Sequence, residues 1–186
     1  MSAPAAPLPL AIEALSAEAF APFGWMLGGE HYDAAATGFS NPGSDFWHVH
    51  DFDAGTGGQP EVLWVNYRND SLRLRLLEAH WLTQQAIVPL GGEIVQVVCP
   101  GREDDPRTPD LQRLRAFRVG NGQGVCMKPG CWHTSFVFAG QTTCLMLTRH
   151  STTADLAAAL QGGPVASESS LVELAALGEA ERQLQP

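Results

Sequence analysis

Glu78 and His80 are the two residues of this chain whose types and spacing most directly suggest chemistry. They end the stretch Leu-Arg-Leu-Arg-Leu-Leu-Glu-Ala-His (residues 72–80), in which leucines alternate with Arg73 and Arg75. This alternation is typical of a half-buried strand, and it predicts that Glu78 and His80 lie on the face of the leucines. A buried carboxylate needs a partner or a metal ion, because its desolvation otherwise costs several kcal/mol. We therefore expect a polar site inside the molecule here.

The segments on either side of this pair predict a fold made of short strands. Turn sequences such as Asn69-Asp70, Gly91-Gly92 and Gly120-Asn121-Gly122 separate most of the apolar runs. Many short strands joined by such turns favour a sandwich or barrel, and eight of them suit a jelly roll. The runs are Glu61–Tyr67, Leu72–His80, Gln85–Pro89, Ile94–Cys99, Leu114–Val119, Val125–Lys128, Ser135–Ala139 and Thr143–Thr148.

Outside this core of about residues 61–148 we expect less regular structure within one domain, 1–186. Residues 1–10 are rich in Pro and Ala and are expected to be loose, and Ser16 is a candidate N-cap of a short helix ending at Phe20. Long loops are expected over 28–60, interrupted by a short strand around Phe46–Phe52. After His150 the pattern indicates two helices, Thr153–Leu160 and Ser170–Leu177.

Composition limits the class of protein. The chain has 186 residues, a net charge of −9 and a sequence pI of about 5.0, which argues against a nucleic-acid-binding surface. It shows no signal-peptide pattern and no apolar run long enough to span a membrane, so no membrane partner is expected. The four cysteines contain no Cys-x-x-Cys pair, and we interpret them as buried free thiols that fit a reducing cytoplasm.

Two motifs about 40 residues apart resemble those of the cupin superfamily. Glu78-x-His80 is followed by Gln85 and Gly92, where the superfamily has His-x-His, an acid and then Gly. The second motif places Gly122 before Lys128-Pro-Gly-Cys-Trp-His133. Two imidazoles and a carboxylate can hold a divalent metal with open positions for a substrate, and Gln85 can add a weaker oxygen ligand. The alternative is that Glu78, His80 and Gln85 only hydrogen-bond one another.

A closer resemblance is to the ureidoglycolate lyase family. It is carried by Leu77–Pro89, Pro109-Asp-Leu111, Arg115-Ala-Phe117, Asn121–Val125 and Trp132-His133. The resemblance implies an all-β, cupin-type jelly-roll barrel with a short N-terminal helix and C-terminal helices. It also implies a site of Glu78, His80, Gln85 and His133, a divalent ion (nickel is suspected, zinc or manganese are possible) and a cytoplasmic homodimer. The activity implied is a C–N lyase that splits ureidoglycolate into glyoxylate and urea in allantoin and purine catabolism.

Candidate substrate-binding and catalytic residues follow from this reaction. Arg68 can bind a substrate carboxylate bidentately, or it is an ordinary charge at a strand end. Lys128 and Glu78 are the candidate catalytic residues. Lys128, the one lysine, can protonate the leaving nitrogen, or it is a solvent-facing turn residue. His50, on the same side of a short strand as His48, and Trp132 can line the site, although a structural role for His50 is equally open.

Departures from the family pattern lie near the expected site and leave other functions open. Met127-Lys128 stands where the family often has Tyr-His, and Thr134 stands where a further His is common. Another metal-dependent cupin enzyme acting on a small hydroxy or keto acid is one alternative. A non-catalytic cupin that binds a small ligand is another.

Overall fold

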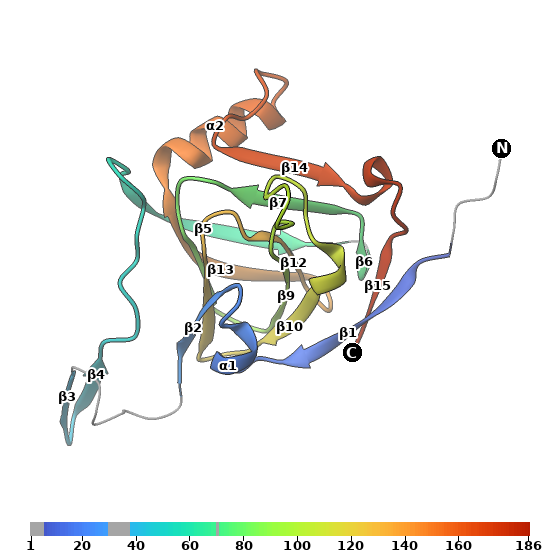
Figure 1. The fold of residues 1–186 in the computed structure, drawn as a ribbon. Coiled ribbons are helices and arrows are strands. Elements are labelled where there is room, and N and C mark those ends of the chain that lie inside the picture. Colours follow the sequence, from blue (N-terminus) through green and yellow to red (C-terminus); the bar gives the residue numbers. More distant parts are fainter. Residues whose placement is uncertain (1–5, 30–37, 70) are drawn as a thin grey trace.

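Two curved β-sheets face each other and enclose the core of the protein (Figure 1). The computed structural model describes residues 6–29, 38–69 and 71–186. The smaller sheet has the order β2 (Gly24–Gly28), β11 (Gln123–Met127), β8 (Gln85–Pro89), β13 (Gln141–Arg149) and β5 (Pro60–Arg68). The larger has the order β14 (Ser169–Glu173), β7 (Leu76–His80), β12 (Trp132–Phe136), β9 (Ile94–Cys99), β10 (Arg115–Val119), β1 (Leu8–Ala14), β15 (Arg182–Gln185) and β6 (Arg73–Leu74).

This arrangement is the cupin-type jelly roll expected from the sequence, and several strand limits agree closely. β8 and β9 have the predicted bounds, and the strand predicted at Glu61–Tyr67 is β5. The strand predicted at Ser135–Ala139 begins earlier, at Trp132, so that His133 lies within β12 rather than before it. Within the described residues no helix is long and apolar enough to cross a membrane.

Two apolar clusters lie on opposite faces of the larger sheet. The cluster between the sheets contains Ile94 and Val98 of β9, together with Phe20, Phe23 and Phe117, whose rings make edge-on or tilted contacts. The outer cluster contains the alternate β9 residues and Trp132, and the C-terminal segment covers it with Leu174 and Leu184. Because both faces of β9 are covered, all six of its residues are buried.

The N-terminal segment is more regular than the sequence indicates. β1 begins at Leu8, inside the stretch expected to be loose, and pairs in parallel with both β10 and β15. The helix α1 (Ala17–Phe20) follows, and the Ser16 side chain accepts a hydrogen bond from the Ala19 backbone N–H, as expected for the N-cap. Its last residue, Phe20, is fully buried in the inner cluster.

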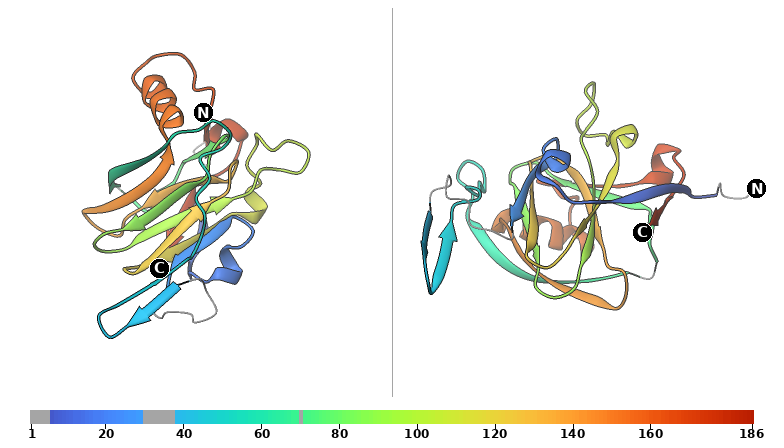
Figure 2. Two further views of the ribbon diagram at one scale, coloured as in Figure 1. Left: turned by 90° about the vertical axis from the view of Figure 1, so that its left-hand side faces the viewer. Right: turned by 90° about the horizontal axis from the view of Figure 1, so that it is seen from below.

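The loop region expected over 28–60 forms a hairpin and a long connection. The hairpin pairs β3 (Gly38–Asn41) with β4 (Ser44–Trp47) and projects from the body of the protein (Figure 2). The predicted strand around Phe46–Phe52 is therefore only partly correct, since β4 ends at Trp47 and residues 48–52 pair with no strand. Residues 30–37 of this region lie outside the described residues.

The C-terminal segment corrects one prediction and confirms another. Helix α2 (His150–Leu160) contains the predicted helix over 153–160. The helix predicted over 170–177 is wrong, because its first half is the strand β14 and its second half is a 3-10 turn, η2 (Leu174–Leu177). β14 pairs with the free edge of β7, and this pairing satisfies backbone groups that a helix would have satisfied internally. A second 3-10 turn, η1 (Leu111–Arg113), precedes β10.

The close approach of β2 to β11 gives a test of the fold. A Cβ atom added at Gly24 would lie 1.9 Å from the backbone oxygen of Cys126, whereas one added at Gly91 would meet nothing within 4 Å. We expect Gly24→Ala to lower the free energy of unfolding by about 1–3 kcal/mol, because one of the two strands must shift. Gly91→Ala is the control. Equal urea midpoints for the two variants would contradict this account of the β2–β11 contact.

Candidate metal centre and substrate cavity

Two neighbouring strands of the larger sheet, β7 and β12, bring the candidate ligands together. In the antiparallel register, His133 of β12 lies directly opposite Glu78 of β7, and residues paired in this way share one face of a sheet. His80 follows two residues after Glu78 and so lies on the same face. One ligand atom from each of Glu78, His80 and His133 lies within 4.8 Å of the others. The sequence motifs thus meet in space as predicted.

The face on which this group lies differs from the prediction. A break at Arg75 separates β6 from β7, and it shifts the alternation by one residue. Leu74, Leu77 and Ala79 therefore pack in the outer cluster, while Glu78 and His80 point the other way, between the sheets. The sequence rule of simple alternation failed because it assumed one continuous strand. The expected consequence, a polar pair inside the molecule, still holds.

Glu78 and His80 line a cavity of about 240 Å³ between the sheets, and His133 lies next to them without lining it. Apolar and hydroxyl side chains of β5, β13 and α2 make up most of its wall, and Gln85 of β8 lies beside the candidate ligands. None of the lining residues is a lysine or an arginine. The lining consists of Leu63, Val65, Tyr67, Glu78, His80, Gln85, Met146, Thr148, Thr152, Thr153 and Leu156.

Two buried polar atoms near this cavity have no hydrogen-bond partner. They are Oε1 of Gln85 and Nε2 of His133. Nε2 of His133 lies 3.4 Å from a Glu78 oxygen, an ion-pair distance without hydrogen-bond geometry. Leaving such atoms unpaired costs about 1–3 kcal/mol each. Their position beside a carboxylate and a second imidazole fits the coordination of a divalent cation, for which these groups are suitable ligands.

The hydrogen bonds of the two histidines leave their other ring nitrogens free for a ligand. Nδ1 of His133 lies 2.9 Å from the backbone oxygen of Cys131, so it must carry the proton and donate it. Nδ1 of His80 lies 2.9 Å from Oγ of Ser169. Metal-binding histidines are commonly oriented in this way, by a partner on the nitrogen that does not bind the metal.

Burial and neighbouring charges keep these groups in the protonation states that bind metals. Burial lowers the pKa of His80 to about 4, helped by His133 and opposed by Glu78, so its imidazole is neutral at pH 7. Burial alone would raise the pKa of Glu78. The interactions of Glu78 with His133 and His80 outweigh burial and lower that pKa, so the carboxyl group is ionised. Metal ligands must be deprotonated, and both groups meet this condition.

The structure places the other sequence candidates away from this cavity. Arg68 lies on the outward face of β5, where it donates to Gln141 over 2.7 Å, because the inward positions are Leu63, Val65 and Tyr67. Lys128 is exposed, and its amine donates to the backbone oxygen of Ala21 over 2.8 Å.

His50 and Trp132 are likewise absent from the lining. His50 stacks on Trp25 at 4.2 Å, and its Nε2 lies 2.9 Å from Gln84 Oε1. Trp132 faces the outer cluster, where it packs against Trp81. It alternates with His133 along β12 and so points to the opposite side of the sheet.

Several cavity residues were not found from the sequence. Tyr67 has its pKa raised by burial and so retains its hydroxyl proton. Thr148, Thr152 and Thr153 come from the end of β13 and the start of α2. The alternation of β5 gives a signal for Tyr67, because it shares a face with Leu63 and Val65. No local pattern marks the threonines, since their role depends on where α2 packs.

A jelly-roll barrel with two histidines and a carboxylate at an inner cavity defines a cupin with a candidate metal centre. The chain belongs to the ureidoglycolate lyase family, because a sequence profile of that family matches residues 7–166. A ureidoglycolate lyase of Rhodobacter capsulatus is 36% identical over 138 residues, which cover 67% of this chain and 75% of that protein. One of Pseudomonas entomophila is 34% identical over 134 residues, covering 67% and 74%.

Solved structures resemble this protein only distantly. A dTDP sugar isomerase of Desulfovibrio desulfuricans has a TM-score of 0.43 at 17% identity, over 81% of this chain and 85% of that one. The sugar 3,4-ketoisomerase QdtA of Thermoanaerobacterium thermosaccharolyticum has a TM-score of 0.39 at 12% identity, over 66% and 77%. The family assignment rests on the sequence relatives alone.

The lowered pKa of His80 predicts how stability depends on pH in the chelator-treated protein. Between pH 6.5 and about 4, His80 is protonated in the unfolded chain but neutral in the folded protein. The free energy of unfolding therefore falls as pH drops. This contribution amounts to about 3 kcal/mol at most. Glu78 acts in the same direction below its ordinary value of 4.5. We expect the free energy of unfolding of His80→Asn, measured by urea titration, to fall less steeply between pH 6.5 and about 4. The same pH dependence as in the wild-type protein would contradict the lowered pKa of His80.

Proposed function

We propose that this protein is a metal-dependent lyase that cleaves ureidoglycolate into glyoxylate and urea. Membership of the ureidoglycolate lyase family supports the reaction. The observation that carries the proposal for the site is the convergence of Glu78, His80 and His133 within 4.8 Å, with Glu78 and His80 lining a cavity between the sheets. The unpaired oxygen of Gln85 adds a fourth candidate ligand beside them.

The reaction needs no oxidant or reductant. In ureidoglycolate one carbon carries a hydroxyl group, a carboxylate and a urea nitrogen. Cleavage removes the hydroxyl proton, and the C–O bond becomes the aldehyde C=O of glyoxylate. The C–N bond breaks with its electron pair passing to nitrogen, which takes up a proton to give urea. The site must therefore assist the loss of one proton and the gain of another.

The proposed ligands are Glu78, His80 and His133, with Gln85 as a neutral oxygen donor. When bound, a divalent cation acts as a Lewis acid on the substrate oxygens and makes the hydroxyl proton easier to remove. We propose nickel, with zinc and manganese as alternatives, since imidazole, carboxylate and amide ligands accept all three. The pKa of Glu78 lies below its ordinary value, which suits a permanently ionised ligand better than a general base.

The remaining cavity residues would bind and orient the substrate. Tyr67 and Thr148 bring hydroxyl groups to the cavity wall, and Tyr67, which hydrogen-bonds Ser135, retains its proton at neutral pH. With no lysine or arginine in the lining, such hydroxyl groups take the orienting role that the sequence suggested for Arg68. Leu63, Val65 and Met146 would exclude water, which strengthens these polar interactions.

The cellular setting is also part of the proposal. We place the enzyme in allantoin and purine catabolism, the context of this reaction, and in the cytoplasm, where four buried free thiols remain reduced. We further propose a homodimer. Val62 and Trp64 on the outward face of β5 are 60% and 66% exposed, and they offer apolar surface that a second copy can cover.

Loss of a proposed ligand should abolish both metal binding and turnover. Changing a residue that only hydrogen-bonds to a metal ligand typically costs about 10–100-fold in metal affinity, so we expect Glu78→Gln and His133→Ala to lose more than about 100-fold. Glu93→Gln is a matched control, because this exposed carboxylate pairs with Arg118 on the surface. The measurements are bound metal by elemental analysis and release of glyoxylate and urea from ureidoglycolate. Wild-type turnover in either ligand variant, or in metal-stripped protein, would overturn the metal-dependent mechanism.

A separate variant tests whether Lys128 is the proton donor. Its amine binds the Ala21 backbone and lies 5.5 Å from the centre of the Trp25 ring, on the protein surface. We therefore expect Lys128→Met to retain kcat, with at most a small loss in Tm. A general acid contributes about 10²–10⁴-fold to the rate. A fall in kcat of that size in a folded variant would return Lys128 to the mechanism.

A further inference from the structure

Ser169 is placed to orient the imidazole of His80. The two residues are directly paired in the antiparallel register of β14 and β7, so their side chains share one face. Oγ of Ser169 lies 2.9 Å from Nδ1 of His80, and both residues are buried, at 3% and 5% exposure. The serine thus contacts the ring nitrogen opposite the one left for a ligand.

The direction of this hydrogen bond matters for the proposed centre. A neutral imidazole has one N–H and one lone pair. If Nδ1–H donates to Ser169, the lone pair of Nε2 is free to bind a cation. Without an acceptor at Nδ1, the proton could move to Nε2 and the ring could turn. Ser169 therefore holds the ring at the angle that a metal ligand requires, and by accepting from Nδ1–H it stabilises the tautomer that leaves Nε2 free.

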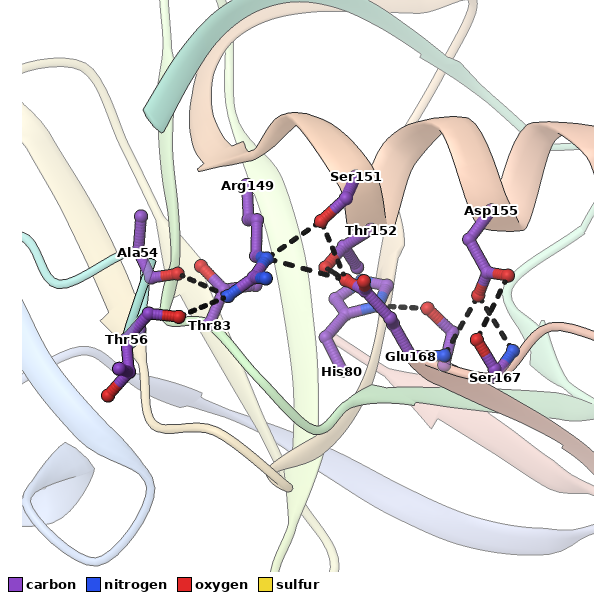
Figure 3. A network of polar contacts seen from close by, with 12 residues as sticks. Ala54, Thr56, His80, Thr83, Arg149, Ser151, Thr152, Asp155, Ser167 and Glu168 are labelled. Atoms are coloured by element: carbon purple, nitrogen blue, oxygen red, sulfur yellow. Dashed lines mark hydrogen bonds and ion pairs between the residues drawn. The ribbon is translucent and has the colours of Figure 1, made fainter. Parts of the chain in front are cut away.

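The residue before Ser169 is fixed by a partly buried polar network. Glu168 lies 3.6 Å from the guanidinium Nε of Arg149, and their side chains are only 16% and 15% exposed. Oγ1 of Thr152, at the start of α2, donates to the same Glu168 oxygen over 2.5 Å. Figure 3 shows Arg149 and Thr152 converging on Glu168, with His80 beside them.

The backbone of this segment is fixed as well. The carboxylate of Asp155 accepts hydrogen bonds from the backbone N–H groups of Ser167 and Glu168, both at 2.8 Å. The carbonyl of Glu168 accepts from the N–H of Trp81, next to His80, at 2.9 Å. The start of β14 is thus held from α2, from the end of β13 and from β7, which leaves Ser169 little freedom relative to His80.

We propose that Ser169 is a positioning residue for the proposed metal ligand His80, and that the partly buried Glu168–Arg149 pair acts through Ser169 by fixing the start of β14. This inference rests on the proposed metal centre and deepens it. It gives the segment that follows β13 a role in the affinity of the centre for its metal ion.

The experiment measures the affinity of the metal-stripped protein for Ni²⁺, by competition with a chromophoric chelator. We expect Ser169→Ala to weaken binding by about 10–100-fold, and Ser169→Thr, which keeps the hydroxyl group, to restore most of it. Ser170→Ala is the matched control, because that hydroxyl accepts from Nε1 of Trp81 and serves no candidate ligand. The visible spectrum of the Co²⁺-loaded protein should change in Ser169→Ala alone, which a merely structural role would not produce.

A double-mutant cycle tests the role of Glu168. We expect Glu168→Gln to weaken Ni²⁺ binding in the same direction as Ser169→Ala, and to add no further loss when the two are combined. Glu173→Gln is the control, because this exposed carboxylate lies at the other end of β14. Fully additive losses would overturn the claim that Glu168 acts through Ser169.

The outcomes separate this inference from the proposed function. If the wild-type protein binds Ni²⁺ but Ser169→Ala, folded by its melting curve, binds it equally well, the positioning role is wrong and the metal centre stands. If the wild-type protein binds no divalent ion, the metal centre fails and the positioning role with it. If Ser169→Ala does not fold, the folded Ser169→Thr variant is compared with Glu78→Gln instead. The proposal is overturned if Ser169→Thr binds Ni²⁺ no more tightly than Glu78→Gln does.

Discussion

The partly buried carboxylate of Glu78 is the constraint on which this site depends. A charge between two sheets must be compensated, and neighbouring imidazoles compensate it well enough to lower its pKa despite burial. That compensation requires His133 to lie opposite Glu78, which the β7–β12 register provides. A slip of one residue would turn His133 to the outer cluster and bring Trp132 to the cavity side. The register of two short strands therefore sets the electrostatics of the cavity.

Sequence reasoning brought the candidate ligands together because their spacing reflects strand geometry. Glu78 and His80 are two residues apart, so any strand assignment puts them on one face, and a second motif supplies His133. The bounds of β8 and β9 were correct because Gly and Pro turns delimit them. Arg68 was proposed to bind the substrate, although the alternation along β5 already placed it on the outward face, with Trp64 rather than with Tyr67. Alternation was the more reliable guide there than charge chemistry.

The errors came where distant pairing decides local structure. Nothing within residues 72–80 marks the break at Arg75, which arises because β6 pairs with β15 and β7 pairs with β14 and β12. The run Ser170–Leu177 has leucine and alanine at spacings that suit a helix, yet the open edge of β7 draws its first half into a strand. Intrinsic propensity differs by less than about 1 kcal/mol per residue, and tertiary pairing readily exceeds it.

The chain beyond the barrel explains why the site could be only partly foreseen. The barrel strands supply Glu78, His80, Gln85 and His133, but they supply no partner for Nδ1 of His80. That partner comes from β14, and helix α2, between β13 and β14, adds threonines to the cavity wall. The same segment thus adds to the cavity wall and, in our proposal, orients one of the candidate ligands. A motif can reveal which residues meet a cation, whereas the hydrogen bonds that hold them in place depend on elements that pack from elsewhere in the sequence.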